Sequence, residues 1–375
     1  MSSSRPQLVF GLTYHGSTPE PVQGLDNVFG KHISAAKLKR HLDWLKRRFR
    51  ILTIGEILDQ ARRGTLPRRT AFIAFHDGYR SNYEVAFPIL KQAGLQADFF
   101  IPTAFIGSGQ RFWVDILDAA LKNTAKSRLD LGINENTMRL SFESKSGRLE
   151  AAHTLRRYLK GLSQKDFEPE FQHTIGELGW SDAAQVPRLG KHEACMNWQQ
   201  VREMAHAGMK FGSHTHRHLI CATQDEETVR DELRISKKLI EDEIRKPCAI
   251  FCYPNGSYPD SGNDFTDRLA REAGYDAVLY MVSPYNLLDQ NAFRLTGIAL
   301  GEWIEFRKFK MALSPLRFRR YRWQKRRLWP WDGGQSGADQ AAVDLGRNRE
   351  HLELRSRICQ PGERMPGYSS LEDDS

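Results

Sequence analysis

The sequence has no apolar run long enough to cross a membrane. A membrane-spanning helix needs about 20 consecutive apolar residues. The opening stretch MSSSRPQLVFGLTYHG contains only a short and interrupted apolar run, which does not suit a signal peptide either. From these absences we expect a cytoplasmic protein, at most peripheral to the inner face of the membrane.

Cysteine is also scarce, with five residues among 375, an odd number that includes no CxxC pair. Such usage argues against a dense disulfide framework. We therefore expect reduced thiols. Because Cys248 and Cys252 flank an apolar, strand-like run, we expect these two to pack in the core rather than to bind a metal.

The chain does have enough apolar residues for a full core, at 40% of its 375 residues. Lys and Arg outnumber Asp and Glu by 55 to 46, which gives a formal net charge of +9. A basic protein favours acidic surroundings such as nucleic acid, anionic lipid or an anionic glycan, and charge alone does not choose among them. The sequence shows no repeat of fixed period.

Short β-rich runs alternate with helical stretches through most of the chain. A T-x-x-E capping box at Thr53 and Glu56 opens a helix that Gly64 closes, and the run TAFIAF that follows is typical of a buried strand. Strand after helix after strand predicts a parallel sheet, and at this length a closed barrel is favoured over an open sheet. We therefore predict an α/β fold, a distorted (β/α) barrel. The strands are expected at residues 8–14, 70–75, 97–101, 209–212, 249–253, 277–282 and 293–299.

Two regions depart from this alternation. Residues 112–198 are mostly helical and polar, and we interpret them as a helical insertion within a barrel domain of residues 1–313. Residues 314–331 then interleave Arg and Lys with Phe, Tyr and Trp. Residues 332–375 are polar and end on acidic residues, which is typical of a poorly ordered tail.

The basic aromatic segment of residues 314–331 admits three interpretations. It is a solvated charged helix, or it adsorbs to an anionic membrane face through its basic residues with Trp and Phe at the interface. The third interpretation, nucleic-acid binding, is the least favoured because no recognised nucleic-acid fold accompanies the segment.

Ligand-type side chains are concentrated directly after four of the predicted strands. In (β/α) barrels the carboxyl ends of the strands form one face, where catalytic residues from distant parts of the chain converge. The four segments therefore predict one site. They are Thr13–Gly16 (TYHG), Phe75–Tyr79 (FHDGY), Ser213–His218 (SHTHRH) and Phe251–Gly256 (FCYPNG).

One carboxylate and two imidazoles among these segments suit a catalytic metal. Asp77, His214 and His218 give three protein ligands, which leaves a coordination position open for water or substrate. This donor set fits Zn²⁺ best, and Co²⁺ or Ni²⁺ are alternatives.

The segments resemble the motifs of the NodB-type polysaccharide deacetylases, carbohydrate esterase family four. The family's T-F-D-D-G-Y motif is similar to residues 74–79, its G-S-H-T-x-x-H motif is intact at residues 212–218, and its F-A-Y-P-x-G motif resembles residues 251–256. The opening L-T-Y-H resembles the poly-N-acetylglucosamine deacetylase branch, in which the strand order is permuted. The similarity covers about Leu8 to Ala299, and it implies the same three metal ligands as above.

The resemblance also implies catalytic roles. His15 corresponds to the general acid of that branch, and the backbone N–H of Asn255 corresponds to an oxyanion donor. Two positions differ from the family pattern: His76 stands where the family has an aspartate base, and Gly297 stands where an arginine orients that base. A histidine base is chemically reasonable, because its ordinary pKa of about 6.5 is close to working pH and a neighbouring dication keeps the ring neutral.

The function that the resemblance implies is metal-dependent removal of N-acetyl groups from an N-acetylhexosamine-containing poly- or oligosaccharide, either chitooligosaccharide-like or an exopolysaccharide precursor, with release of acetate. One alternative is a catalytically inactive glycan-binding homologue that has lost the base. Another is hydrolysis of a different amide or ester, such as an O-acetyl group or an acetylated lipid-linked sugar. Tyr79, Trp113 and Tyr253 are candidates to stack on sugar faces, with core packing as the alternative.

Overall fold

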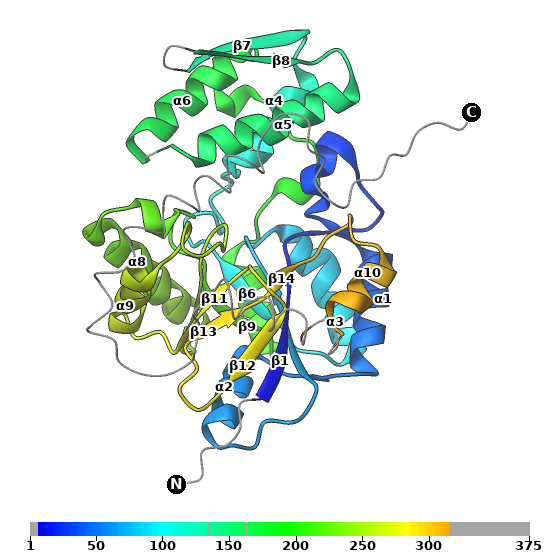
Figure 1. The fold of residues 1–375 in the computed structure, drawn as a ribbon, viewed down its shortest axis with the longest axis vertical. Coiled ribbons are helices and arrows are strands. Elements are labelled where there is room, and N and C mark those ends of the chain that lie inside the picture. Colours follow the sequence, from blue (N-terminus) through cyan, green and yellow to red (C-terminus); the bar gives the residue numbers. More distant parts are fainter. Residues whose placement is uncertain (1–6, 134–135, 163, 315–317, 319–375) are drawn as a thin grey trace. The chain divides into compact units, whose positions relative to one another are not determined.

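The structure is a computed structural model, and it describes residues 7–133, 136–162, 164–314 and 318. Its centre is one sheet, whose strands are separated along the chain mostly by helices (Figure 1). The strands are β1 (Gln7–Tyr14), β4 (Arg50–Ile51), β5 (Thr70–Phe75), β6 (Asp98–Ile101), β9 (Lys210–Ser213), β10 (Ile250–Cys252), β11 (Ala277–Tyr280), β12 (Tyr285–Leu288), β13 (Arg294–Thr296) and β14 (Ile298–Ala299). Their order is β12-β1-β5-β6-β9-β10-β11-β13, in which β12 is antiparallel to β1 and the later neighbours are parallel.

The last strand segment closes the sheet into a barrel. β13 pairs with β11, and beyond Gly297 the chain continues as β14, which pairs with β1 at Leu12 and Thr13. Gly297 donates its N–H to the carbonyl oxygen of Tyr280 at 2.8 Å. A Cβ at this position would lie 2.5 Å from Thr13 Cγ2, so the close approach of the two strands requires glycine. The predicted (β/α) barrel is therefore confirmed.

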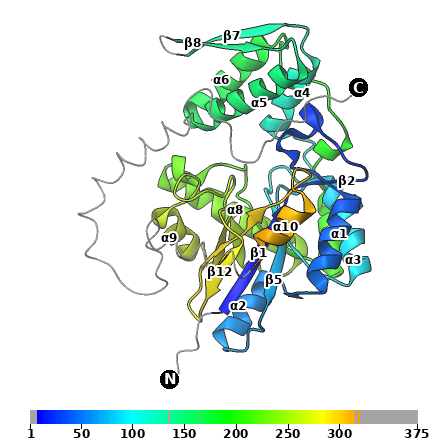
Figure 2. The same cartoon turned by 45° about the vertical axis from the view of Figure 1, so that its right-hand side comes forward.

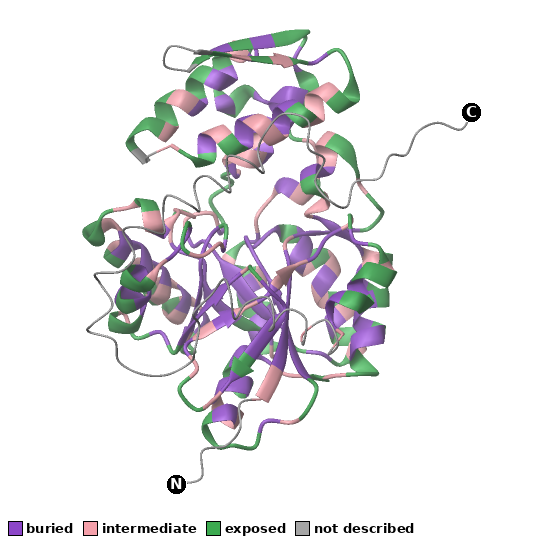
Figure 3. Ribbon diagram, viewed as in Figure 1, coloured by how far each residue is buried: buried purple, intermediate pink, exposed green. Residues whose placement is uncertain are grey.

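Most residues of the central barrel strands are buried, as Figure 3 shows for the central sheet. In β5, the run TAFIAF is buried along its whole length, which is the pattern of a parallel strand covered by helices on one side and by the barrel interior on the other. The Phe75 ring lies 5.4 Å from that of Tyr14 and 5.0 Å from that of Phe99, so neighbouring strands share one aromatic layer.

Helices cover the outside of the barrel (Figure 2). α2 begins at the predicted capping box: the carboxylate of Glu56 accepts the N–H of Thr53 at 2.8 Å, while the Thr53 hydroxyl accepts the N–H of Glu56. The helices of the barrel are α1 (Ala35–Lys46), α2 (Ile54–Arg62), α3 (Phe87–Ala93), α7 (Trp198–His206), α8 (Glu226–Ile244), α9 (Asp264–Glu272) and α10 (Phe306–Ala312).

Between β6 and β9 the chain builds a separate group of elements with its own apolar core. These are α4 (Trp113–Asn123), β7 (Arg128–Ile133), β8 (Asn136–Ser141), α5 (Lys145–Lys160) and α6 (Gln164–Glu177). The sequence predicts the helices but not the β7–β8 hairpin. Its signal is a short alternation in which Leu129 and Leu131 are buried and Asp130 is exposed, too brief to outweigh the helical patterns around it.

The basic aromatic segment of residues 314–331 lies outside the described residues apart from Ser314 and Phe318, and so does all of 332–375. The Phe318 ring lies 5.4 Å from the ring of Tyr285 in β12. In the described part of the chain, no helix combines the length and the apolar character needed to cross a bilayer.

Candidate active site

Asp77, His214 and His218 come together at the carboxyl ends of β5 and β9. The Nε2 atoms of His214 and His218 lie 3.4 Å and 3.3 Å from Oδ1 of Asp77. Two donor atoms that each bind one ion at about 2.1 Å with tetrahedral geometry lie about 3.4 Å apart, so these spacings fit a divalent metal. The donor set thus has the chemistry and the dimensions of a site with three protein ligands.

Backbone conformation and hydrogen bonds aim these side chains. Asp77 and His218 both adopt left-handed backbone angles, with φ of 69° and 62°, which turn the chain sharply after each strand. The Nδ1 atom of His214 lies 2.7 Å from the carbonyl oxygen of Cys252. Because a carbonyl only accepts, Nδ1 carries the hydrogen and the Nε2 lone pair faces Asp77.

The charges of the ligands also suit a cation. Burial by itself would raise the pKa of Asp77, but the interactions with His214 and His218 hold it well below its ordinary value. Burial lowers the pKa of His214. An ionised carboxylate beside a neutral imidazole is the state in which both groups donate electron pairs to a metal.

The loop that carries both histidines is fixed by a residue that sequence reasoning missed. Glu232 in α8 is buried, and its Oε2 accepts the backbone N–H groups of His216 and Arg217 at 2.8 Å and 2.7 Å. The His216 side chain turns away from the ligands and contacts Thr103 Oγ1 through Nδ1 at 2.8 Å. Glu232 lies in a highly charged helix, so its role could not be distinguished in the sequence.

His76, the residue in place of the family's aspartate, is fully buried beside the ligand group. Its ring lies 5.3 Å from that of His214, and its Nδ1 lies 3.5 Å from Sγ of Cys252. Its Nε2 has no hydrogen-bond partner among the described residues. Burial and the neighbouring histidines lower the pKa of His76 well below its ordinary value, so the ring is neutral.

Cys252 is buried as expected, but it also belongs to the site. Its Sγ, with one nitrogen of His76 and one of His214, forms a second group of donor atoms within 4.8 Å of one another. The sequence placed Cys252 in the third motif and still favoured a purely packing role. The sequence feature that could have indicated a role in the site is the place of Cys252 within the third motif, because that motif borders the site.

His15 lies beside His76, with 5.5 Å between the two ring centroids. It directly follows β1, as the sequence predicts for a residue at this face. Burial lowers the pKa of His15, and the nearby Asp77 opposes that shift. The structure thus gathers His15, His76 and Asp77 around one point.

Asn255 follows β10 in a left-handed conformation, with φ of 66°. Its side-chain Oδ1 accepts a hydrogen bond of 2.7 Å from Nζ of Lys160, at the end of α5. Desolvation lowers the pKa of Lys160 to about 8, although its side chain keeps contact with water. Sequence reasoning missed Lys160, because nothing local links the end of an insertion helix to a loop 95 residues later.

Two of the three candidates for sugar stacking are corrected by the structure. Tyr79 is fully buried, and its hydroxyl donates to Asp115 at 2.9 Å and accepts from Lys31 at 3.1 Å. Tyr253 is fully buried too, and its hydroxyl donates to Asp267 at 2.7 Å. Their rings are therefore not available to a ligand.

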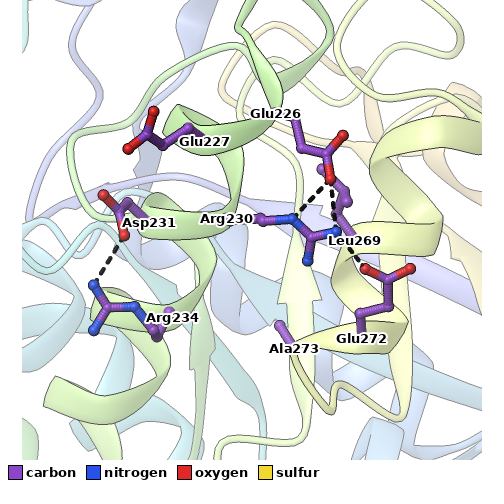
Figure 4. Close-up of a pocket in the computed structure, with 8 residues that line it drawn as sticks. All are labelled: Glu226, Glu227, Arg230, Asp231, Arg234, Leu269, Glu272 and Ala273. Carbon is purple, nitrogen blue, oxygen red and sulfur yellow. Dashed lines mark hydrogen bonds and ion pairs between the residues drawn. The ribbon is translucent and has the colours of Figure 1, made fainter.

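Trp113 is half-buried and lines a pocket of about 340 Å³ that also contains His218. A second hollow lies between α8 and α9 (Figure 4). There the Arg230 guanidinium pairs with both Glu226 and Glu272, and Arg234 pairs with Asp231. Because these charges satisfy one another at the surface, this hollow offers no comparable chemistry.

Comparison with known proteins gives a family match. Residues 63–278 match the model of the polysaccharide deacetylase family, and this range includes the candidate ligands Asp77, His214 and His218. It thus takes in most of the barrel.

Curated relatives point the same way. The poly-β-1,6-N-acetyl-D-glucosamine N-deacetylase of Staphylococcus aureus strain MRSA252 is 34% identical over 188 residues, which are 48% of this chain and 60% of that protein. The protein of the same name from strain MSSA476 is 25% identical over 188 residues, with the same shares. The chain therefore spans about 60% of the length of these relatives.

Solved structures support the fold. The Streptococcus pyogenes deacetylase PplD in complex with acetate has a TM-score of 0.53 and 15% identity, over 83% of this chain and 100% of that chain. A de-N-acetylase from Aggregatibacter actinomycetemcomitans has a TM-score of 0.51 and 17% identity, over 82% and 100%. At such identities the likeness establishes the architecture.

Proposed function

This chain belongs to the polysaccharide deacetylase family, and from that premise we propose that it hydrolyses N-acetyl groups of an N-acetylhexosamine-containing poly- or oligosaccharide and releases acetate. The observation that carries the proposal is the convergence of Asp77 Oδ1 with the Nε2 atoms of His214 and His218 at 3.4 Å and 3.3 Å. The named activity of the S. aureus relatives makes a polymer of N-acetylglucosamine the first substrate to try.

Asp77, His214 and His218 would hold the metal ion, with Zn²⁺ the best match to one carboxylate and two imidazoles and Co²⁺ or Ni²⁺ as alternatives. Such an ion supplies Lewis acidity, which polarises an acetamide carbonyl and acidifies water. The carbonyl oxygen of Cys252 keeps His214 in the tautomer that this role needs.

His76 is the proposed general base. Its neutral ring and its Nε2, which has no partner among the described residues, leave a lone pair ready to accept the proton of an attacking water. Cys252 Sγ at 3.5 Å from Nδ1 holds the other side of the ring. In this assignment the proposed base is still a side chain next to the metal ligands, with an imidazole in place of the family's carboxylate.

His15 is the proposed general acid, and the N–H of Asn255 is the proposed oxyanion donor. The ring of His15 lies 5.5 Å from that of His76, so a proton accepted by one imidazole has a short path to the other and then to the leaving amine. The hydrogen bond from Lys160 to Oδ1 fixes the side chain of Asn255. An N–H aimed at the developing charge stabilises the tetrahedral state.

The direct test is acetate release from a panel of N-acetylated oligosaccharides, including β-1,6-linked N-acetylglucosamine oligomers and chitooligosaccharides. The full chain is assayed with added Zn²⁺, Co²⁺ or Ni²⁺ and again after chelation. We expect release that depends on one of these ions. No release from any member of the panel would contradict the proposed activity.

A second candidate is a catalytically inactive glycan-binding homologue, and the specific observation in its favour is His76 at the position of the aspartate base. This candidate predicts that the protein binds metal and N-acetylated oligosaccharide but releases no acetate. Measuring glycan affinity by calorimetry beside the acetate assay separates the two candidates.

A further inference from the structure

The pocket beside His218 is lined in part by aromatic and aliphatic side chains, which hydrolysis at the candidate metal site does not require. Its volume of about 340 Å³ falls within the roughly 300–1,000 Å³ of small-molecule sites. One wall comes from the loop that carries His218, and another comes from α4, α5 and α6. The pocket therefore joins the candidate site to the elements inserted between β6 and β9.

An apolar path leads from the candidate metal ligand into these elements. The Phe112 ring lies 5.0 Å from the ring of His218. The next residue, Trp113, lies 5.3 Å from Phe167, which in turn stacks 5.7 Å from Phe171. All of these side chains line the same pocket, so a ligand that enters beside His218 meets an apolar wall, with polar side chains elsewhere in the lining.

Several of the apolar side chains on this path are only partly buried. Trp113, Ile116, Leu162 and Phe167 pack against the apolar core of α4, α5 and α6 and keep part of their surface exposed. Apolar surface that gathers around a pocket and stays in contact with water is typical of a binding site. Covering it would be favourable in proportion to its area.

The chemistry of the wall favours a hydrocarbon over further sugar units. Sugar hydroxyls that leave water need hydrogen-bond partners, and the side chains of Ile116, Leu162 and Phe167 offer none. The charged side chains in the rest of the lining already have protein partners. Glu168 pairs with Gln172 at 2.9 Å, Arg111 with Glu193 at 2.8 Å, Lys160 with Asn255 at 2.7 Å and Arg217 with Glu232 at 2.7 Å. A hydrocarbon chain loses no hydrogen bond there.

We propose that this pocket binds a hydrocarbon chain attached to the sugar, so that the substrate is an N-acetylated glycolipid. The inference rests on the proposed deacetylase function and adds the chemical class of the aglycone. The acetamido group lies at the site of Asp77, His214 and His218, and the chain runs past Phe112 into the space between Trp113 and Phe167.

The test compares methyl and n-octyl β-D-N-acetylglucosaminide as substrates of the full chain, below the critical micelle concentration of the octyl compound. Each buried methylene strengthens binding by roughly fourfold, so even partial burial of the octyl chain should lower KM by at least about tenfold with little change in kcat. Equal KM values for the two glycosides would overturn the proposal. So would a methyl disaccharide that lowers KM while the octyl chain does not.

A matched pair of variants locates the effect. Phe167→Ser removes a ring from the pocket, and Phe265→Ser removes an exposed ring from α9. We expect the octyl preference to fall at least about fivefold in the first variant and to persist in the second. Equal loss in both would place the octyl chain elsewhere and overturn the proposal. Melting curves of both variants report whether each one folds. The comparison of the methyl and octyl glycosides with the wild-type protein does not depend on either variant.

A binding measurement separates this proposal from the proposed function. n-Octyl β-D-glucoside has no acetamido group, so calorimetric titration detects its binding without turnover. If the octyl glucoside binds in a Phe167-dependent manner while no acetate is released from any substrate, the pocket assignment stands and the deacetylase assignment fails. If acetate is released from both N-acetylglucosaminides with equal KM, the deacetylase assignment stands and the pocket assignment fails.

Discussion

His76 occupies the position of the first aspartate in the T-F-D-D-G-Y motif that residues 74–79 resemble, and its surroundings suit an imidazole. The ring is fully buried, 5.5 Å from the ring of His15 and 5.3 Å from that of His214, and burial lowers its pKa. A carboxylate in the same place would add a negative charge close to Asp77. The neutral ring avoids that charge and still offers a lone pair at Nε2.

The assignment of His76 as base predicts a large loss on its removal. His76→Ala should reduce kcat for acetate release by about 10²- to 10⁴-fold, which is the usual contribution of a general base. His76→Asp, which restores the family's residue, should retain more activity than the alanine variant. Full activity of His76→Ala would show that another group accepts the proton. Metal content measured in each variant confirms that the ligand site is intact.

In the β13–Gly297–β14 segment, the residue at a single position allows β14 to pair with β1. Gly297 bridges two neighbours of the barrel, and its backbone passes so close to Thr13 that no side chain fits between them. A larger side chain at position 297, such as the arginine that the family resemblance assigns to this position, would meet Thr13. In this chain the position serves barrel closure instead.

Gly297→Ala should lower the free energy of unfolding by about 1–3 kcal/mol, the usual cost of overpacking. Thr13→Ala removes the Cγ2 atom that a Cβ at 297 would meet, so the double variant should recover part of the loss. Chemical denaturation measures both changes. The matched control is Gly55→Ala in α2, where a Cβ meets nothing within 4 Å and the change should be neutral or slightly stabilising. Equal effects at 55 and 297 would contradict the packing argument.

α1 and α10 meet through a buried histidine that has no part in the site. The His41 ring stacks 3.8 Å from Phe309, and its Nδ1 lies 3.2 Å from the hydroxyl of Tyr14. Burial lowers the pKa of His41 to about 3. This contact between two helices is therefore made by a neutral ring.

The lowered pKa of His41 determines the direction in which the free energy of unfolding changes with pH. Because the folded-state pKa lies below the unfolded value of about 6.5, its contribution to stability is complete above pH 6.5 and is lost as the pH falls from 6.5 toward 3. In His41→Phe, the unfolding free energy should fall less steeply over this range. Urea denaturation at a series of pH values measures the slope, with His206→Phe on the exposed face of α7 as the control. Parallel slopes for wild type and His41→Phe would refute the assignment.

At the scale of the whole molecule, the candidate metal site connects parts of the chain that are far apart in sequence. Asp77 belongs to β5 and its loop, whereas His214 and His218 follow β9, more than a hundred residues later. An ion held by all three residues binds the folded chain and not the unfolded one. Metal binding should therefore stabilise the entire barrel.

Zn²⁺ at about 100 times its Kd should add about 2.7 kcal/mol to the free energy of unfolding, seen as a higher Tm, and a chelator should reverse the change. Asp77→Ala and His214→Ala should abolish the response. His216→Ala is the matched control, because its side chain turns toward Thr103 and away from the ligands. A response to Zn²⁺ that survives in Asp77→Ala would place the ion elsewhere.

The sequence by itself determined the barrel, the capping box of α2 and the segments that supply the candidate site. These features depend on patterns within short stretches, such as the alternation of strand and helix, a T-x-x-E spacing, or ligand residues directly after a strand. A contiguous stretch carries such a pattern before it folds. For this reason Asp77, His214 and His218 could be named together without any coordinates.

Only the tertiary structure decided which other side chains join or leave the site. Glu232 and Lys160 reach it from distant helices, and Cys252 faces His76. Tyr79 and Tyr253, by contrast, are sealed in the interior by hydrogen bonds to remote carboxylates. These outcomes depend on packing between segments far apart in the chain, where the energy of a contact is set by both partners and the local sequence encodes only one of them.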